Sequence, residues 1–535
     1  MARQPPLAVL GLFLLAIVVT TGGGLDMPPD GHEAYVLQTT REMHGRGDWV
    51  VPYFNGAPRL NKPPLSYWLS GTVAGMTGEI ADIQPWQGRV PSILGALLML
   101  ASTLLIGRCL FDRSTALLGG IVLATSAGYF AHAHDARPDM LYAGLCSAAF
   151  AAMTLGMLTT RERRPALRPA LAMWLCLAMA TLAKGPQVPI MLLLAAALLC
   201  GRDSLRVLHP VRGLALMTLL TLPWWWLLQN RLGGTQLEHS QLSGTLLTLD
   251  VRRFLDMYYL RAPLQLLLPW LVLIPSAVVC PFRRHEWRTA ARWLAMPIVV
   301  AMTLFTLGPQ HRWFYLLPLL PQMCLLLAVG MIRSLNTGWL SRLGDWLIPM
   351  HAVVILGAAV WIMTKPESPP GLRAGLAITV ILCVVIALIA RQRKWRSPAA
   401  IAAAIGVMVA SLYANPVLTP ILWSDERFDH ARLAMAAVKA AGDSAPLAVL
   451  GLNPDVYAYY AASRPVVVMN SPAEAAILTA AAPGRRIVLI LRSAEIASLP
   501  ASLDVEVVDA MPGKPSAALS VLRLRPAARQ SGVTG

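Results

Sequence analysis

Residues 90–164, VPSILGALLMLASTLLIGRCLFDRSTALLGGIVLATSAGYFAHAHDARPDMLYAGLCSAAFAAMTLGMLTTRERR, decide how this chain folds. Three apolar runs, at about 90 to 107, 114 to 131 and 140 to 159, are separated by a basic segment around Arg108 and Arg113 and by a polar segment ending at Asp139. A helix that crosses a bilayer needs about 20 largely apolar residues. The stretch therefore predicts three consecutive membrane-spanning helices.

The composition of the whole chain agrees with this prediction. Of 535 residues, 56% are hydrophobic and 14% are charged, whereas about 25% of residues are charged in ordinary soluble domains. Such a chain cannot supply the polar surface of several soluble domains. We therefore expect an α-helical polytopic membrane protein.

Apolar runs of spanning length recur along the sequence, and we expect about thirteen transmembrane helices in a domain covering residues 1–415. The predicted spans are 5 to 24, 90 to 107, 114 to 131, 140 to 159, 169 to 183, 186 to 201, 211 to 229, 262 to 281, 293 to 309, 314 to 332, 345 to 364, 371 to 390 and 398 to 415. The first run also fits a cleaved signal peptide; that alternative leaves the later topology unchanged.

The charges predict the orientation of these spans. With the N-terminus in the cytoplasm, Arg3 and the cytoplasmic loops hold 20 positive charges against five acidic residues, which is the bias typical of cytoplasmic loops. The net charge of +17 thus orients the protein and does not indicate a nucleic-acid partner. The long loops 25–89 and 230–261 and the C-terminus are then expected outside.

From about residue 416 the pattern changes to that of a small external α/β domain, residues 416–535. Runs typical of strands lie at 446–450, 465–469, 487–491 and 519–524, and helix-like stretches lie between them at 455–462 and 472–482. This domain has no glycine-rich phosphate loop. We expect it to have an accessory packing role rather than to bind substrate.

The first external loop holds the most informative motifs. It contains Asp30-Gly-His-Glu33-Ala-Tyr35, Arg41-Glu-Met, Gly47-Asp-Trp and Asn61-Lys62-Pro-Pro-Leu-Ser-Tyr-Trp68. Residues 33–43 have the spacing of a helix along the membrane surface. Further motifs at expected external ends of spans are Arg137-Pro-Asp139-Met, Ala183-Lys184-Gly-Pro, Glu238-His239 and His311-Arg312 with Tyr315-Leu-Leu-Pro.

In this order the motifs resemble the GT-C integral-membrane glycosyltransferases over about residues 10 to 330. The nearest branch contains the 4-amino-4-deoxy-L-arabinose lipid A transferases and the protein mannosyltransferases. The resemblance implies that Asp30, Glu33 and Asp139 are catalytic. It also implies substrate-binding roles for Lys62, Lys184, Arg312, Tyr315, Tyr35 and Arg137.

Each assignment has a structural alternative. Asp30 and Glu33, three residues apart, fit a helix capping box. Asp139 can cap the fourth span, and Lys184 can cap the last carbonyls of the fifth. His239 is a possible metal ligand or a solvated loop residue, and His132 with His134 forms a weaker candidate metal pair.

Two departures from the family pattern limit the inference. Counting back from Arg41 without a gap places His32, not Asp30, at the family's first aspartate. Asn61 stands where the aminoarabinose branch has a metal-binding glutamate, and a neutral amide is a poor ligand for a transition metal. A divalent-metal cofactor and an aminoarabinose substrate are therefore both open.

A membrane glycosyltransferase must hold the phosphate of a lipid-linked sugar with cations and activate the acceptor with a carboxylate. We therefore expect the chain to transfer a sugar from a polyprenyl phosphate to a lipid or protein acceptor on the external face of a bacterial inner membrane. The rivals are a polytopic transporter or lipid flippase, which predicts inverted repeats and broken helices, and an inactive scaffold that binds the lipid carrier.

Overall fold

The computed structural model describes residues 6–21, 25, 27–161, 166–201, 204–233, 258–283, 285–308, 311–336, 341–364, 370–392, 397–413, 426–462, 464–482, 484, 486–511 and 518–527. Its contacts divide the chain into two compact units. The helical unit comprises Met1–Leu25, Leu60–Leu69 and Arg89–Leu422, and the mixed unit comprises Asp26–Arg59, Ser70–Gly88 and Trp423–Gly535. Most of the first external loop is thus grouped with the C-terminal segment.

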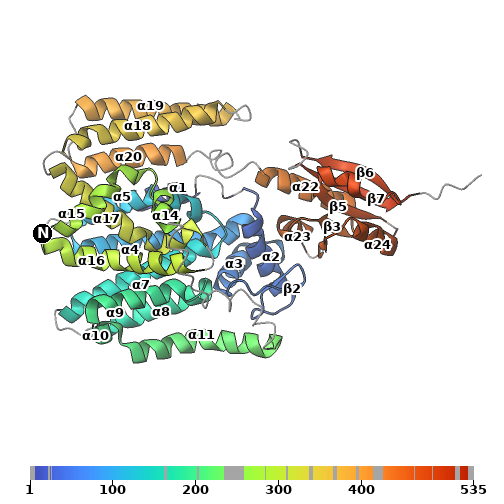
Figure 1. Cartoon of the computed structure of the whole chain (residues 1–535), viewed down its shortest axis with the longest axis horizontal. Coiled ribbons are helices and arrows are strands. Elements are labelled where there is room, and N and C mark those ends of the chain that lie inside the picture. Colours follow the sequence, from blue (N-terminus) through green and yellow to red (C-terminus); the bar gives the residue numbers. More distant parts are fainter. Residues whose placement is uncertain are drawn as a thin grey trace, which may run out of the picture. The chain divides into compact units, whose positions relative to one another are not determined.

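The described part of the helical unit consists of α-helices with two short 3-10 helices (Figure 1). They are α1 (Pro6–Thr21), α4 (Pro85–Leu110), α5 (Arg113–Ala124), α6 (Ala127–Ala133), α7 (Pro138–Arg161), α8 (Leu167–Ala183), α9 (Gln187–Cys200), α10 (Ser204–Leu208), α11 (Pro210–Leu232), α14 (Tyr258–Leu266), η4 (Trp270–Leu273), α15 (Ile274–Arg283), α16 (His285–Leu307), η5 (Trp313–Leu319), α17 (Leu320–Asn336), α18 (Ser341–Met363), α19 (Pro370–Gln392) and α20 (Pro398–Tyr413).

Among the described residues, five helices are long and apolar enough to cross a membrane. Two further candidates are bent pairs: α5 with α6 at 59°, and α14 with residues 270–283 at 118°. Six shorter apolar helices also overlap predicted spans, and the described residues thus support five spans, or up to seven if each bent pair is one span, rather than the full predicted count. The chain is therefore a multi-pass membrane protein, mostly helical as expected, although the bends were not predicted.

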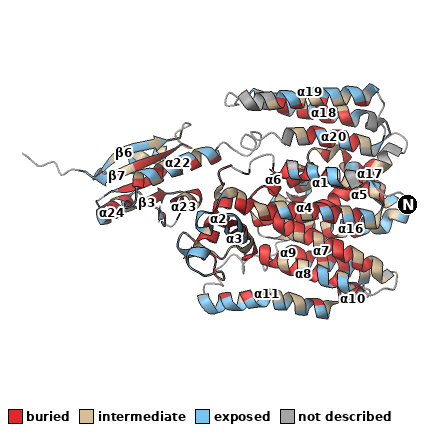
Figure 2. Cartoon of the chain, turned by 180° about the vertical axis from the view of Figure 1, so that it is seen from behind, coloured by how far each residue is buried: buried red, intermediate tan, exposed pale blue. Residues whose placement is uncertain are grey.

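Burial distinguishes the central helices from the peripheral ones (Figure 2). Of the apolar windows, 72% of the one in α7 and 89% of the one in 313–333 are buried inside the protein, against 17% of the one in 206–232. The last of these presents Leu219, Leu222 and Trp226 to the surroundings. Since these apolar side chains are not covered by the described residues, this face is the type of surface that contacts lipid chains.

Two glycines bring α4 and α7 into backbone contact. A Cβ atom on Gly144 would lie 2.2 Å from the carbonyl oxygen of Gly95, and one on Gly95 would lie 2.6 Å from Cα of Leu141. Small residues of this kind allow membrane helices to approach closely. The contact lies near the start of α7 and therefore helps to fix the position of Asp139.

The mixed unit combines helices with two sheets. Its elements are α2 (Gly31–Gly45), β1 (Tyr53–Phe54), β2 (Ala57–Pro58), the later part of α3 (Leu65–Thr77), η1 (Ile80–Asp82), α22 (Glu426–Ala441), β3 (Leu447–Leu450), α23 (Asp455–Ala461), β4 (Val467–Met469), α24 (Ala473–Ala481), β5 (Ile487–Arg492), η8 (Ser493–Ser498), β6 (Leu503–Ala510) and β7 (Leu519–Pro526).

The larger sheet has the strand order β4-β3-β5-β7-β6. Strand β3 is parallel to β4 and β5, while β7 is antiparallel to β5 and β6. The register of β6 shifts at a bulge between Val507 and Asp509. Strand β6 at the sheet edge carries alternating charge; its Glu506 pairs with Arg523 and Arg525 of β7.

The first external loop shares its core with the C-terminal elements. Ala34 and Leu37 of α2 pack with Val456 and Tyr459 of α23, and Phe54 belongs to the same buried cluster as the strands β3 and β5. The two segments are therefore parts of one folded unit, which their separation in the sequence does not suggest.

Candidate functional site

Asp139 and Lys184 form the centre of the candidate site in the helical unit. Pro138 begins α7, a position that suits its fixed φ and missing N–H, and this places Asp139 in the first turn. Lys184 follows the last residue of α8, where its backbone N–H donates to the carbonyl of Ala180. Since α7 packs extensively against α8, Nζ of Lys184 reaches Asp139 and donates a hydrogen bond to Oδ1.

The pair is largely withdrawn from water: the side chains of Lys184 and Asp139 are 13% and 11% exposed. Aromatic rings surround the ammonium group, which lies 4.9 Å from the ring centroid of Tyr315, 5.2 Å from Phe314 and 5.7 Å from Tyr142. Rings of this kind attract a cation through their negative faces. The sequence predicted Tyr315 as a neighbour, but it did not predict Tyr142 or Phe314.

Lys62 and Arg312 add positive charge in the same unit. Lys62, just before α3, interacts electrostatically with the Asp139 carboxylate, so Lys62 and Lys184 act on one carboxylate from two separate segments. Arg312 precedes η5 with an exposed side chain, and its guanidinium interacts electrostatically with the phenol of Tyr315. Its backbone N–H donates to the Tyr259 hydroxyl at 3.3 Å.

Arg137 is held on the segment that leads into α7. Its Nε atom lies 3.6 Å from Oδ2 of Asp135, and its carbonyl accepts a hydrogen bond from Oγ of Ser92 at 3.0 Å. Lys62 and Lys184 act on Asp139, Arg137 pairs with Asp135, and Arg312 interacts with Tyr315, so the cations of this set outnumber its two carboxylates. The excess of positive charge suits an anion.

The candidate metal ligands predicted from the sequence are histidines. The described residues include no group of three or more His, Cys, Asp or Glu side chains placed to hold a metal ion. His132 is buried, with Nδ1 3.1 Å from the carbonyl of Gly128 and its ring against Trp313 and Phe314. His239, the predicted metal ligand, lies outside the described residues together with Glu238.

Asp30 and Glu33 lie in the mixed unit and form the capping box that the sequence offered as an alternative. Oδ1 of Asp30 accepts from the Glu33 N–H at 2.8 Å, and Oε2 of Glu33 accepts from the Asp30 N–H at 3.2 Å. Arg427 of α22 donates to both, at 3.3 Å to Oδ2 of Asp30 and 3.0 Å to Oε2 of Glu33. The capping interpretation is confirmed; the catalytic roles of the two carboxylates stay predictions.

Tyr35, one turn along α2, is packed rather than open. Its ring meets Phe54 edge-on at 4.5 Å, and the Arg59 guanidinium lies 4.2 Å above it. Burial, followed by the charge of Asp455, raises the pKa of the Tyr35 phenol. Burial is also the main cause of the raised pKa of Asp455, which is increased further by the Asp30 carboxylate.

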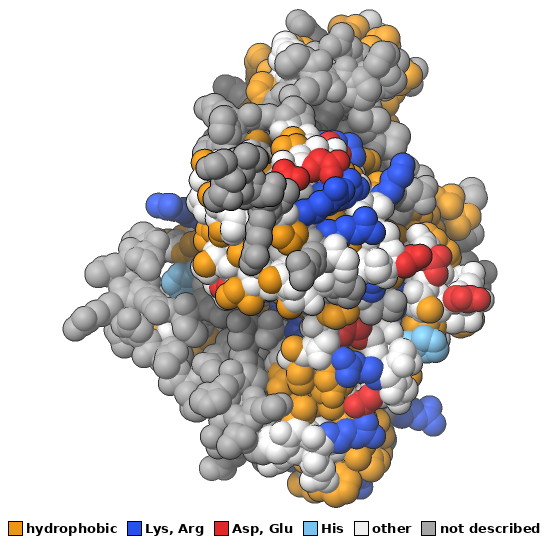
Figure 3. Space-filling view, turned by 90° about the vertical axis from the view of Figure 1, so that its right-hand side faces the viewer, with side chains coloured by type: hydrophobic (Ala, Val, Ile, Leu, Met, Phe, Trp, Pro, Cys, Tyr) orange, Lys and Arg blue, Asp and Glu red, His pale blue; other side chains and the backbone are white. Residues whose placement is uncertain are grey.

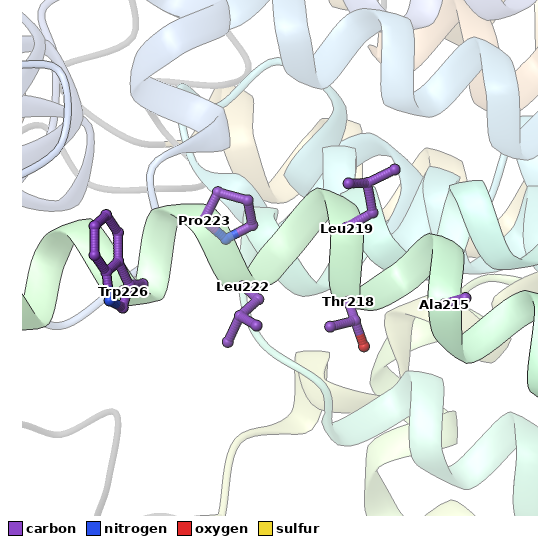
Figure 4. Close-up of a pocket in the computed structure, with 6 residues that line it drawn as sticks. All are labelled: Ala215, Thr218, Leu219, Leu222, Pro223 and Trp226. Atoms are coloured by element: carbon purple, nitrogen blue, oxygen red, sulfur yellow. The ribbon is translucent and has the colours of Figure 1, made fainter.

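A shallow apolar hollow of about 560 Å³ lies along α11 (Figure 4). All its lining residues come from that helix, namely Ala215, Thr218, Leu219, Leu222, Pro223 and Trp226. It contains none of the charged groups described above. We therefore interpret it as part of the lipid-facing surface.

Comparisons with known proteins define the class. The family described as dolichyl-phosphate-mannose-protein mannosyltransferase matches residues 61–227, the range that holds Lys62, Asp139 and Lys184. The chain has the fold of the GT-C integral-membrane glycosyltransferases, and the resemblance that its motifs predict is confirmed.

The particular relatives come from the aminoarabinose branch. The chain is 24% identical over 402 residues to the undecaprenyl phosphate-alpha-4-amino-4-deoxy-L-arabinose arabinosyl transferase of Pectobacterium carotovorum, covering 72% of this chain and 70% of the relative. It is 23% identical to the enzyme of that name from Serratia proteamaculans, covering 67% of this chain and 66% of the relative.

Solved structures give the same result for the fold. ArnT from Cupriavidus metallidurans in the apo state superposes with a TM-score of 0.74 at 20% identity, covering 96% of this chain and 97% of that one. The structure of the same protein bound to undecaprenyl phosphate gives 0.73 at 20% identity, with 97% and 98% covered. The similarity therefore extends through the mixed unit as well as the helices.

Proposed function

We propose that the chain is a glycosyltransferase that moves a sugar from a polyprenyl phosphate, of the undecaprenyl type, to a lipid or protein acceptor. The observation that carries this proposal is the buried Asp139–Lys184 pair, with Lys62 acting on the same carboxylate and aromatic rings around the ammonium. A phosphate diester carries one negative charge, and the cationic excess at this site matches it.

The chemistry follows from the charges. The acceptor attacks the anomeric carbon, the bond from that carbon to the phosphate oxygen breaks, and the electron pair leaves with the phosphate. Charge on the departing phosphate therefore grows during the step. Lys62, Lys184 and Arg312 stabilise that growing charge, which is the interaction that lowers a barrier most effectively.

Asp139 has two roles in this proposal. Before the donor arrives, its carboxylate holds Lys184 in place and offsets the charge of the buried ammonium. When the phosphate engages Lys184, the carboxylate becomes available to accept the acceptor's proton as a general base. Attack on the side opposite the departing phosphate inverts the anomeric configuration. Asp30 and Glu33 remain separate candidates for work on the acceptor.

The proposed topology places this chemistry outside a bacterial inner membrane. Thirteen spans with a cytoplasmic N-terminus put the start of α7 and the end of α8 on the external side, together with the first loop and the C-terminal α/β domain. The excess of arginine and lysine in the opposite loops supports this orientation.

A vesicle assay tests the proposal against its rivals. The purified full chain is reconstituted and supplied with a polyprenyl-phosphate sugar labelled in the sugar, together with extracted membrane lipids and proteins as acceptors. Label transferred to an acceptor supports the enzyme. Label that only crosses the bilayer indicates a transporter or flippase, and label that only binds indicates a scaffold; either result refutes the proposal.

A further inference from the structure

Arg427 connects the C-terminal segment with two carboxylates of the first loop. It lies on α22, and its guanidinium is 7% exposed. It is separated from Glu33 by 394 positions in the sequence. The two nitrogens of its fork donate to two different carboxylates, so that one cation serves both Asp30 and Glu33.

The contacts of Arg427 with Asp30 and Glu33 help to fix the first turn of α2. Both oxygens of Asp30 are engaged, Oδ1 by the Glu33 N–H and Oδ2 by Arg427. The Glu33 side chain is fully buried, and its Oε2 accepts both from the Asp30 N–H and from Arg427. A buried carboxylate needs a paired cation, because an isolated charge is strongly disfavoured in an apolar environment.

The rest of the interface fixes α2 along its length. The Arg41 guanidinium donates to the carbonyls of Tyr459 and Ala81 at 2.8 Å each, and Nε2 of Gln38 donates to the carbonyl of Ala462 at 2.8 Å. Gly31 lies so close to α23 that a Cβ atom there would be 2.2 Å from Oδ2 of Asp455. Of these contacts, those of Arg427 are the ones in which a side chain binds the carboxylates proposed to be catalytic.

We propose that Arg427 is a positioning residue for sugar transfer: it makes the C-terminal α/β segment hold the start of α2, and with it Asp30 and Glu33, in the conformation that the reaction uses. This inference rests on the proposed function. It gives the C-terminal segment a defined role, since Arg427 on α22 supplies a cation that pairs with the buried Glu33.

The surface of the mixed unit offers a matched control. Figure 3 shows acidic and basic side chains interspersed on the exposed face that it draws. Arg432, five positions after Arg427 on α22, is 43% exposed and pairs with Asp509 of β6. Substituting it removes the same charge from the same helix without touching α2.

The experiment compares Arg427→Met, Arg432→Met and wild type as full chains in nanodiscs. Hydrogen exchange of residues 31–45 reports the order of α2, and the transfer assay reports kcat and the KM for the donor. For Arg427→Met we expect amide exchange in the first turns of α2 to quicken at least tenfold. We expect kcat to fall at least tenfold and the donor KM to stay within threefold, because Lys62 and Lys184 belong to the other unit. Arg432→Met should match wild type.

The double variant Glu33→Gln/Arg427→Met also removes the buried charge of Glu33. Recovery of slow exchange in α2 shows that charge compensation is what Arg427 supplies. The positioning role is overturned if Arg427→Met keeps a normal kcat while amide exchange in α2 is fast. It is also overturned if kcat falls while amide exchange in α2 is unchanged. If wild type itself transfers no sugar, the proposed function fails, while the exchange data still decide whether Arg427 orders α2.

Discussion

Replacing Asp139 with asparagine separates the two roles assigned to its carboxylate. The substitution keeps the size of the side chain and an oxygen that can accept a hydrogen bond from Lys184, but it removes the negative charge. In the wild-type protein a donor phosphate that engages Lys184 is expected on the other side of the ammonium from Asp139, and two hydrogen bonds to one nitrogen then put the two anions about 5–6 Å apart. At an effective dielectric constant of about 20, the repulsion between the two anions is then about 3 kcal/mol.

Losing that repulsion is expected to tighten binding of polyprenyl phosphate by roughly 100-fold, since about 1.4 kcal/mol corresponds to a factor of ten. The transfer rate should move in the opposite direction. Removing a general base costs about 10²- to 10⁴-fold in kcat. The assay measures the dissociation constant of polyprenyl phosphate and, separately, sugar transfer at saturating donor, both in nanodiscs.

A suitable control is Asp112→Asn, because Asp112 caps α5 through a 2.7 Å contact with the Thr115 N–H and asparagine caps a helix equally well. It should change neither measurement. Weaker phosphate binding in Asp139→Asn would refute the reasoning. It would mean that the carboxylate contributes to phosphate affinity, as it would if it held a metal ion that bridges to the phosphate. Unchanged kcat would refute its role as a base.

Three further predictions concern the fold around the site. Gly144→Ala is expected to separate α7 from α4, because its Cβ atom would overlap the Gly95 carbonyl, and to lower both the unfolding temperature and kcat; unchanged values of both would show that the close approach is not required. Lys184→Met leaves the buried Asp139 without this partner and should destabilise the solubilised protein by about 3–5 kcal/mol, a loss that Lys184→Met/Asp139→Asn should largely reverse in thermal melts. Burial raises the pKa of Asp455, so ionisation of this carboxyl lowers the stability of the folded state. The loss of stability is absent below the unfolded pKa of about 3.9 and complete above the folded pKa. Asp455→Asn should therefore raise the unfolding temperature at pH 7 but not near about pH 3.5; a lower unfolding temperature at pH 7 would contradict this.

The apolar pattern predicted the helices of the membrane domain well, because a run of about 20 apolar residues has few other folds available to it. The apolar pattern did not predict the bends within individual spans. The break between α5 and α6 occurs at Thr125 and Ser126, whose hydroxyls donate to carbonyls of the preceding turn. Hydroxyl side chains that bond to the helix backbone in this way often bend helices.

In the C-terminal segment the predicted strand runs coincide with β3, β4, β5 and β7, which are apolar enough to stand out. Strand β6 is not predicted because Asp504 and Glu506 alternate with valines along this edge strand, so it contains no apolar run. Charged side chains of this kind protect an exposed sheet edge from pairing with another chain. Helix α22 was missed for a similar reason, since its first turn is charged.

The candidate site was predictable as a set of residues but not as a set of contacts. Motif order placed Asp139 and Lys184 at external ends of neighbouring spans, and the packing of α7 against α8 brought them together. No local signal connects Arg427 with Asp30 and Glu33, because that contact depends on folding the two ends of the chain into one unit. The catalytic role predicted for Asp30 and Glu33 is therefore an alternative to the structural role that the fold gives them through Arg427.

The central claim is that the cluster of Asp139, Lys184 and Lys62 binds the phosphate of the lipid-linked donor. The most direct test measures the dissociation constants of polyprenyl phosphate and of polyprenol of the same chain length, for wild type and for Lys184→Met/Asp139→Asn. The account predicts that wild type prefers the phosphate by about 10- to 150-fold, the contribution of one charged hydrogen bond, and that the variant loses most of this preference while its affinity for polyprenol is unchanged. Equal preference for the phosphate in both proteins would contradict the claim.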